Sequence, residues 1–361
     1  MKKIIAGISA VALCLLMSVG INAESKNNEN KYIVDLDDGG KDYVQIENDV
    51  EIHSLVPPSG FNPIEATDEE LAQYCFPPRP EDEEELSQWI SNMECYNTTP
   101  IPEIKYSEGK APKKKAMEYA NYVSTDDQFD FASTAGYRAF TSCYAEVSQV
   151  QMNYIQPTVS AISGFCYNRY GIGIGGSTNE TRLSAGTCTY GKTTHNAWIQ
   201  WRSEVVNWTS TPMHLISVDS LHINAGDSIH LYIAYEKENN KFSYYIANNT
   251  TGEAHSGYNI LSSATYYDGL LAHWFVERVH DLDVSNINPN INNTDYFNLG
   301  NFGTFTASMC QYKLLNTSSW INLSNATSLQ KNVMKNNGRV LCEPGSVFGG
   351  SCFTCTWQAY N

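Results

Sequence analysis

The strongest constraint on the fold is a segment in which large apolar side chains recur at every second position on both sides of a polar turn. Ile229, Leu231 and Ile233 alternate with other residues, the turn Glu-Asn-Asn-Lys follows at 238–241, and the apolar alternation returns over 242–246. Because successive side chains of a strand point to opposite faces, a period of two indicates strands rather than a helix. We therefore predict an antiparallel hairpin with one buried face.

The same texture extends through most of the chain. From about Thr134 onward, short runs rich in Tyr, Val, Ile, Thr and Trp are separated by Gly, Asn and Asp, and no long helical period interrupts them. Several short strands with regular turn signals are typical of an all-β protein. A two-sheet antiparallel β-sandwich is the natural way for such strands to bury one face each.

The N-terminal part differs in charge. Residues 24–105 hold 20 acidic and 5 basic residues, whereas 106–361 hold 19 acidic and 16 basic residues. Thr67 before three acidic residues predicts a helix start, and Glu83–Met93 predicts a second short helix. These helices have little apolar face, so we expect this small acidic leader to pack on another domain.

A basic segment, 110–115, follows the leader and is either a maturation cleavage site or a solvated hinge. We therefore divide the chain into four parts. The expected parts are a signal peptide (1–23), an acidic leader or propeptide with its basic linker (24–115), a β-sandwich (116–310) and a Cys-rich C-terminal extension packed on the sandwich (311–361).

The extreme N-terminus indicates export. Two lysines precede an apolar run from Ile4 to Val19 and a small-residue site near Ala23, which is the pattern of a secretory signal peptide. Nine cysteines remain after its removal, and disulfides persist in secreted proteins. Cys75 with Cys95 could staple the leader, although the odd count leaves at least one cysteine unpaired.

Charge and motifs exclude several functions. The net charge of −16 argues against a nucleic-acid partner, which requires a basic surface. No later apolar run is long enough to span a membrane. The Cys352–Cys355 spacing is read as part of a disulfide set, and the oxygen-rich segment 281–286 lacks the glycine and the closing Glu of a calcium loop. We expect no metal, and a monomer.

One carboxylate stands out in the apolar stretch from Ala272 to Val279. In a strand, Glu277 shares a face with His273 and Phe275. Such a carboxylate is either solvated or used in chemistry.

Three segments, 222–253, 272–279 and 299–306, resemble in this order the glutamic peptidases, or eqolisins. The likeness spans roughly 134–306. Weaker likenesses lie at 134–140, 170–177, 182–187 and 196–203. The resemblance implies a concanavalin A-like or lectin-like jelly roll of two bent antiparallel sheets, secretion, acid endopeptidase activity and no cofactor.

The family's catalytic pair is one Glu and one Gln. The resemblance implies that Glu277 is the general acid and base, a role that needs a carboxyl whose pKa is raised by desolvation. The family's Gln corresponds to Ser184, whose hydroxyl is shorter than a carboxamide. Gln200, on a neighbouring strand, could supply the missing amide. Losing one oxyanion donor costs about 10²- to 10³-fold in turnover.

Four further residues are expected to line the substrate groove. Trp198 and Arg202 share the face of Gln200 by alternation, Phe275 shares that of Glu277, and Tyr170 stands next to the position where the family has a Trp. A guanidinium from Arg202 within about 4–6 Å of Glu277 would lower the pKa of its carboxyl.

Two functions remain open. The first is a secreted endopeptidase that hydrolyses unfolded polypeptide, with Glu277 as acid and base and Gln200 or Ser184 as its partner. The second is a sandwich that binds peptide or glycan without catalysis, because the Gln–Glu pair is lost.

Overall fold

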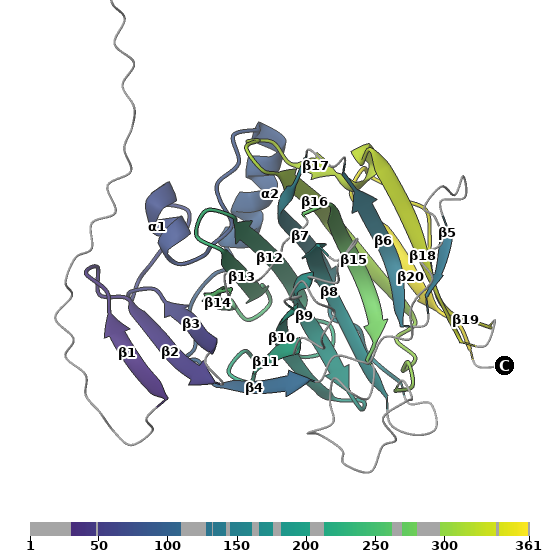
Figure 1. Ribbon diagram of the computed structural model, residues 1–361, viewed down its shortest axis with the longest axis horizontal. Coiled ribbons are helices and arrows are strands. Elements are labelled where there is room, and N and C mark those ends of the chain that lie inside the picture. Colours follow the sequence, from purple (N-terminus) through teal and green to yellow (C-terminus); the bar gives the residue numbers. More distant parts are fainter. Residues whose placement is uncertain are drawn as a thin grey trace, which may run out of the picture.

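The computed structural model of the chain describes residues 30–47, 50–109, 128–131, 133–141, 145–160, 166–175, 182–202, 213–261, 269–279, 297–336 and 339–359. Within these ranges the protein consists almost entirely of antiparallel strands (Figure 1), with two short α-helices and one 3₁₀ turn, η2 (Leu323–Asn325). None of the described helices has the length and apolar character needed to cross a membrane.

Sheet I is the layer that carries Glu277. Its strands pair in the order β4–β11–β10–β9–β8–β15–β6–β18, and the short β5 pairs in parallel with β18. Their bounds are β4 Ile104–Gly109, β11 Met213–Val218, β10 Thr194–Arg202, β9 Arg182–Tyr190, β8 Tyr167–Gly175, β15 Leu271–Arg278, β6 Thr134–Phe140, β18 Ser328–Asn336 and β5 Gln128–Phe131.

Sheet II faces sheet I across the core. Its strands pair in the order β1–β2–β3–β14–β13–β12–β7–β16–β20. Their bounds are β1 Lys31–Asp35, β2 Lys41–Glu47, β3 Val50–Val56, β14 Glu253–Ile260, β13 Lys241–Asn248, β12 Ser228–Glu236, β7 Val147–Ile155, β16 Thr304–Leu314 and β20 Phe353–Trp357, with β17 (Ile321–Asn322) beside β16. The predicted hairpin is confirmed as β12 and β13, with Leu231 opposite Ile246.

The two sheets are joined along one side by a strand that belongs to both. β19 (Arg339–Pro344) pairs with β18 of sheet I and with β20 of sheet II. Between the sheets lies one large apolar core, to which Ile172 and Ile199 contribute from sheet I and Leu231 and Tyr244 from sheet II. The predicted all-β, two-sheet antiparallel sandwich is confirmed.

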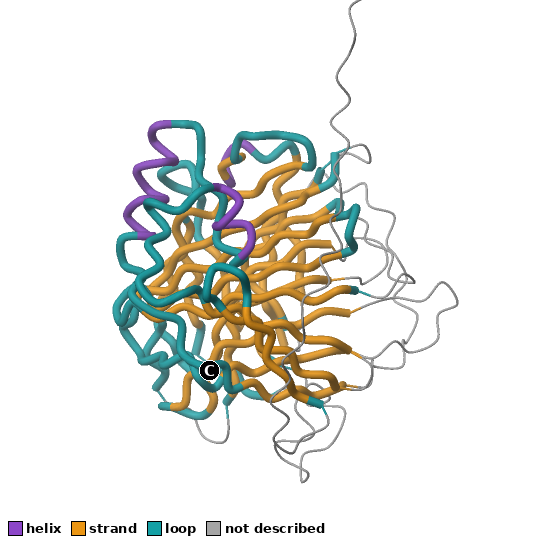
Figure 2. The backbone as a smooth tube through the Cα atoms, turned by 90° about the vertical axis from the view of Figure 1, so that its left-hand side faces the viewer, coloured by secondary structure: helices purple, strands orange, loops and turns teal. Residues whose placement is uncertain are grey.

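The acidic leader packs on the outer face of sheet II. Helices α1 (Asp68–Gln73) and α2 (Glu83–Met93) lie on one side of the strand layers (Figure 2). Leu71, Trp89 and Met93 form an apolar cluster with Tyr232 and Tyr245 of sheet II. Thr67 caps α1 as predicted, accepting the Glu70 N–H while the Glu70 carboxylate accepts the Thr67 N–H.

The leader also extends both sheets. Its strand β3 pairs with β14, and its strand β4 pairs with β11. As expected, the helices do not stand alone but pack on sheet II through their apolar cluster. The helices and the apolar cluster lie behind sheet II, opposite the outer face of sheet I on which Glu277 stands.

The eight cysteines that the structure describes are free thiols. The expected Cys75–Cys95 staple is therefore absent from it. Cys75 is buried next to Ser243, and Cys95 bonds the Ser91 carbonyl instead.

Candidate active site

Four neighbouring strands of sheet I place polar side chains on one outer face. On β8, alternation puts Arg169 on the opposite face from Tyr170, which points into the core. The strand register sets Arg169 beside Glu277 and Ser184 beside Gln200. The expectation that Trp198 shares the face of Gln200, and Phe275 that of Glu277, follows from the same alternation, and Trp198 and Phe275 lie together in one cluster.

Arg169 connects the two residues that the sequence proposed as a pair. Its Nη1 donates to Gln200 Oε1 at 2.8 Å and lies 3.9 Å from Glu277 Oε2. The Arg169 side chain is 0% exposed and that of Glu277 only 13% exposed. A buried charge requires a counter-charge and hydrogen bonds, and each member of this group supplies one to another. Glu277 therefore lies in a largely dry site, and one guanidinium contacts both its carboxylate and the carboxamide of Gln200.

Aromatic rings enclose the guanidinium. Its central carbon lies 5.0 Å from the ring centre of Trp198 and 5.4 Å from that of Tyr167. These distances fit cation–π contacts. The Trp198 and Phe275 rings are 6.3 Å apart, and the Trp198 indole N–H donates to the Thr187 carbonyl, which fixes the ring. Arg169 is thus fixed by stacking as well as by hydrogen bonding.

The rings can close over the strand because β8 has glycines on this face. A Cβ added at Gly171 would lie 2.9 Å from Trp198 and 3.1 Å from Phe275, and one at Gly173 would meet the His273 ring. Burial raises the pKa of the Tyr167 phenol and that of the Cys188 thiol, so both groups are neutral beside Arg169.

Ser184 lies on the same face and is fully buried. Its hydroxyl donates to the backbone carbonyl of Gln200 at 3.4 Å, which is a long hydrogen bond. The hydroxyl is therefore directed at the backbone of the neighbouring strand. Of the two expected partners of Glu277, it is Gln200 whose side chain contacts Arg169, the residue that Glu277 also contacts.

The structure places only some of the expected site residues side by side. Five of them lie together on the outer face of sheet I: Glu277, Gln200, Ser184, Trp198 and Phe275.

The expectation that Tyr170 lines the groove is wrong. Its ring is buried inside the sandwich, stacked on Phe305 at 5.4 Å, because it occupies the inner positions of β8 together with Ile172. Arg202 ends β10 opposite Met213, and its side chain lies outside the described part of the chain.

Sequence reasoning missed Arg169. It expected a cation beside Glu277, but from Arg202. The available signal was the strand alternation itself, because Arg169 is the one charged residue in Tyr167–Gly175 and falls on the face of Gly171 and Gly173. What the sequence lacked was the pairing of β8 with β15, which is not a local property.

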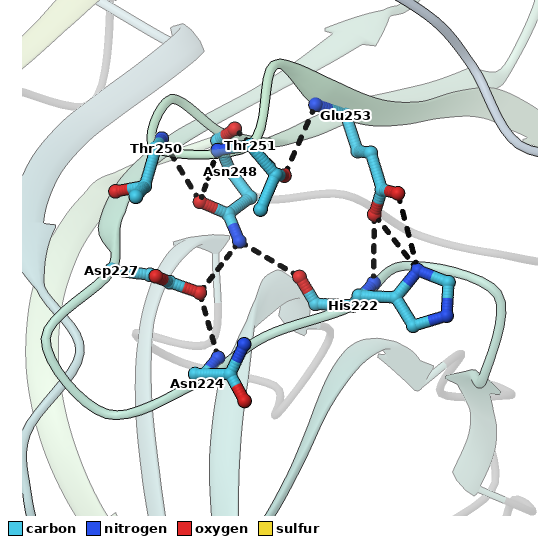
Figure 3. Close-up of polar contacts among 7 residues, drawn as sticks. All are labelled: His222, Asn224, Asp227, Asn248, Thr250, Thr251 and Glu253. Atoms are coloured by element: carbon cyan, nitrogen blue, oxygen red, sulfur yellow. Dashed lines mark hydrogen bonds and ion pairs between the residues drawn. The ribbon is translucent and has the colours of Figure 1, made fainter.

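A second polar cluster lies at the end of sheet II (Figure 3). Asp227 accepts from the Asn224 backbone and from the Asn248 amide, both at 2.7 Å, and His222 Nδ1 lies 3.0 Å from Glu253. These contacts connect the loop before β12 to the turn after β13, so they serve the fold. Within the described residues, no group of three or more His, Cys, Asp or Glu side chains is placed to hold a metal ion.

The chain belongs to the Peptidase A4 family, whose family model matches residues 132–357. No curated protein matches it. Among solved structures it is similar to SCP-B, a member of the eqolisin family of peptidases in complex with the tripeptide Ala-Ile-His, at 18% identity and a TM-score of 0.48. It is also similar to scytalido-glutamic peptidase with a peptide-based transition-state analogue, at 19% identity and a TM-score of 0.49. Each alignment covers 63% of this chain and 98% of the other.

Proposed function

We propose that this protein is a secreted glutamic endopeptidase in which Glu277 and Gln200 act on the peptide bond of unfolded polypeptide. The observation that carries the proposal is the bridge from Gln200 through Arg169 to a nearly buried Glu277. A carboxylate and a carboxamide that contact the same guanidinium in a largely dry site are the two groups that acid hydrolysis of a peptide needs. Family membership supports the same chemistry.

In this proposal Glu277 first acts as a general base. It takes a proton from water as the water oxygen attacks the scissile carbonyl carbon, and it later gives that proton to the departing amide nitrogen. Gln200 stabilises the oxyanion. Its Oε1 accepts from Arg169, so its NH₂ group is directed away from the guanidinium and is the end that can donate to a carbonyl oxygen.

Arg169 is a positioning residue in this proposal. It sets the orientation of the Gln200 amide and provides the positive charge that a buried Glu277 carboxylate requires. Trp198 and Phe275 form the apolar wall beside the pair and shield it from bulk water.

The test uses the full chain and denatured protein as substrate between about pH 2 and pH 7. We expect cleavage that Glu277→Gln abolishes and that Gln200→Ala reduces about 10²-fold or more. Glu236→Gln, at the exposed end of β12, is the matched control and should retain full activity. Cleavage that survives Glu277→Gln would refute the assignment.

The second candidate is a binder of peptide or glycan without catalysis. The observation that favours it is the Arg169–Glu277 contact, because a buried cation and a carboxylate can also form an ion pair that serves only the structure. No cleavage by the wild type at any pH, together with retained binding of an oligopeptide or oligosaccharide measured by calorimetry, would select this function.

Secretion, the signal peptide 1–23 and the monomeric state are also proposed. Residues 1–23 lie outside the described part of the chain, and their pattern is the support. N-terminal sequencing of exported protein should begin just after Ala23, and light scattering should give the mass of one chain.

A further inference from the structure

Four cysteines converge where the two sheets are joined. Cys310 lies on β16, Cys342 on β19 and Cys355 on β20, and Cys352 lies in the turn that precedes β20. Cys310, Cys342 and Cys355 are 0% exposed, whereas Cys352 is half-buried. These positions, which we call the cysteine cluster, play no part in the proposed hydrolysis.

Backbone contacts bring Cys310 and Cys352 together. The Cys310 N–H donates to the Ser351 carbonyl at 2.9 Å, which places Cys310 beside the residue that precedes Cys352. β16 has an irregular register between Ser308 and Gln311, and Met309 has a positive φ of 52°, so the strand is kinked where it carries this thiol. Burial raises the pKa of Cys310 most, and among the neighbouring thiols Cys352 raises it further than Cys355 does.

Cys342 and Cys355 are brought together by neighbouring strands. In the β19–β20 pair, Cys342 is opposite Trp357 and Cys355 is opposite Pro344, so the two thiols lie diagonally on one face. Both thiols are buried in the core, and after burial itself it is the Cys355 thiol that most raises the pKa of Cys342. Burial raises the pKa of Cys342 and that of Cys310 well above the usual range, so both are neutral thiols in the reduced protein.

We propose that the cysteine cluster forms two disulfides, Cys310–Cys352 and Cys342–Cys355. Four cysteines allow three connectivities, and the contacts above favour this one. The bonds would connect β16, β19 and β20, which are the strands that close the sandwich beside sheet I. The cluster is thus a redox-dependent staple on the scaffold.

Each bond forms by oxidation with a dissolved disulfide such as oxidised glutathione. Two S–H bonds break and one S–S bond forms, and the two electrons and two protons reduce the external disulfide to two thiols. Because Cys352 is half-buried and the other three are buried, the external disulfide is attacked first by Cys352, and Cys310 then displaces the bound glutathione. Cys310 also interacts with Cys355, which gives exchange a route to the second pair.

The test maps the bonds in the full chain. Protein purified under reducing conditions is oxidised with glutathione, both in the folded state and during refolding from denaturant, then alkylated, digested and analysed by mass spectrometry. We expect disulfide-linked peptides that join Cys310 to Cys352 and Cys342 to Cys355. The melting temperature of the oxidised protein should be higher by about 5 °C or more than that of the reduced protein.

Two variants add a kinetic check. Cys352→Ser should slow oxidation of the folded protein at least about tenfold, because it removes the accessible thiol. Cys95→Ser, in the leader, is the control and should leave the rate unchanged. A crossed connectivity, only one of the two bonds, four alkylated thiols after oxidative refolding, or a zinc ion bound by the four sulfurs would overturn the proposal. None of these results bears on Glu277, so a failure here leaves the peptidase proposal standing.

Discussion

At the scale of single residues, Arg169 is the side chain on which the candidate site depends most. A flat guanidinium can donate to Gln200 and remain beside Glu277 while it stacks on Trp198, and an ammonium group cannot make all three contacts.

We therefore expect Arg169→Met to lower kcat by about 10²-fold with little change in KM, because it disturbs the reacting groups rather than substrate contacts. Arg169→Lys should recover part of kcat because it restores the charge. Equal losses in both variants, in step with a loss of thermal stability, would show that Arg169 serves only the fold.

A second residue-scale prediction concerns a buried histidine. His255 on β14 is stacked on Tyr244, and burial lowers its pKa to about 4. In the unfolded chain it titrates near about 6.5. Between these values the unfolded state binds a proton that the folded state refuses, so stability falls as pH falls through this window and levels off below it.

Replacement of His255 by Phe keeps the ring and removes the titration. The slope of the unfolding free energy against pH should become shallower by up to about 1.4 kcal/mol per pH unit between about pH 6.5 and pH 4. Urea unfolding at several pH values measures this slope. An unchanged slope would mean that the folded protein protonates His255 as readily as the unfolded chain does.

At the scale of elements, the register of β6 against β15 places Glu277. Gly136 on β6 has a φ of 142°, and a Cβ there would lie 2.1 Å from the Trp274 carbonyl oxygen. The strands can pair this closely only because the side chain is absent.

Gly136→Ala should destabilise the protein by about 1–3 kcal/mol and reduce activity, because β15 must shift. Gly60→Ala is the matched control, since Gly60 has a φ of 83° with nothing within 4 Å of the added carbon. It should cost only about 1 kcal/mol and leave activity intact. Urea midpoints compare the two, and equal costs would show that contact with β15 is unimportant.

The helices could be predicted from the sequence, whereas the pairing of strand β8 could not. α2 covers the predicted residues Glu83–Met93, with Asp82 accepting from two N–H groups of its first turn. Capping is local, so a few residues determine it. By contrast, the strand beside β8 is β15, about a hundred residues later in the chain, and strand pairing depends on the whole sheet.

At the scale of the whole molecule, the leader is part of the fold. It covers Tyr232 and Tyr245 with apolar side chains and supplies edge strands to both sheets. Its loss would expose this apolar surface and two unpaired strand edges.

A chain that begins after residue 109 should therefore aggregate or fail to fold, as judged by gel filtration and near-ultraviolet circular dichroism. A cut within the basic segment 110–115 should instead leave the two fragments associated, because the strand pairing and the apolar packing that hold them together do not require an intact chain. A stable, monomeric product from the truncated chain would show that the leader is a dispensable propeptide.

The sequence by itself determined the strand periods, the helix caps and the faces on which Trp198, Gln200 and Glu277 stand. These are local properties, because side chains alternate along a strand whatever lies beside it. Alternation also places Tyr170 on the face of its strand opposite Arg169. The expectation that Tyr170 lines the groove came instead from the Trp that the family has at the next position.

Only the tertiary structure decided which cation stands beside Glu277, which face the leader covers and which cysteines meet. Arg169 and Glu277, Cys310 and Cys352, and Tyr245 and Trp89 are each distant in sequence. Their proximity follows from strand pairing and from burial of apolar surface over the entire chain, and no local pattern records either of these.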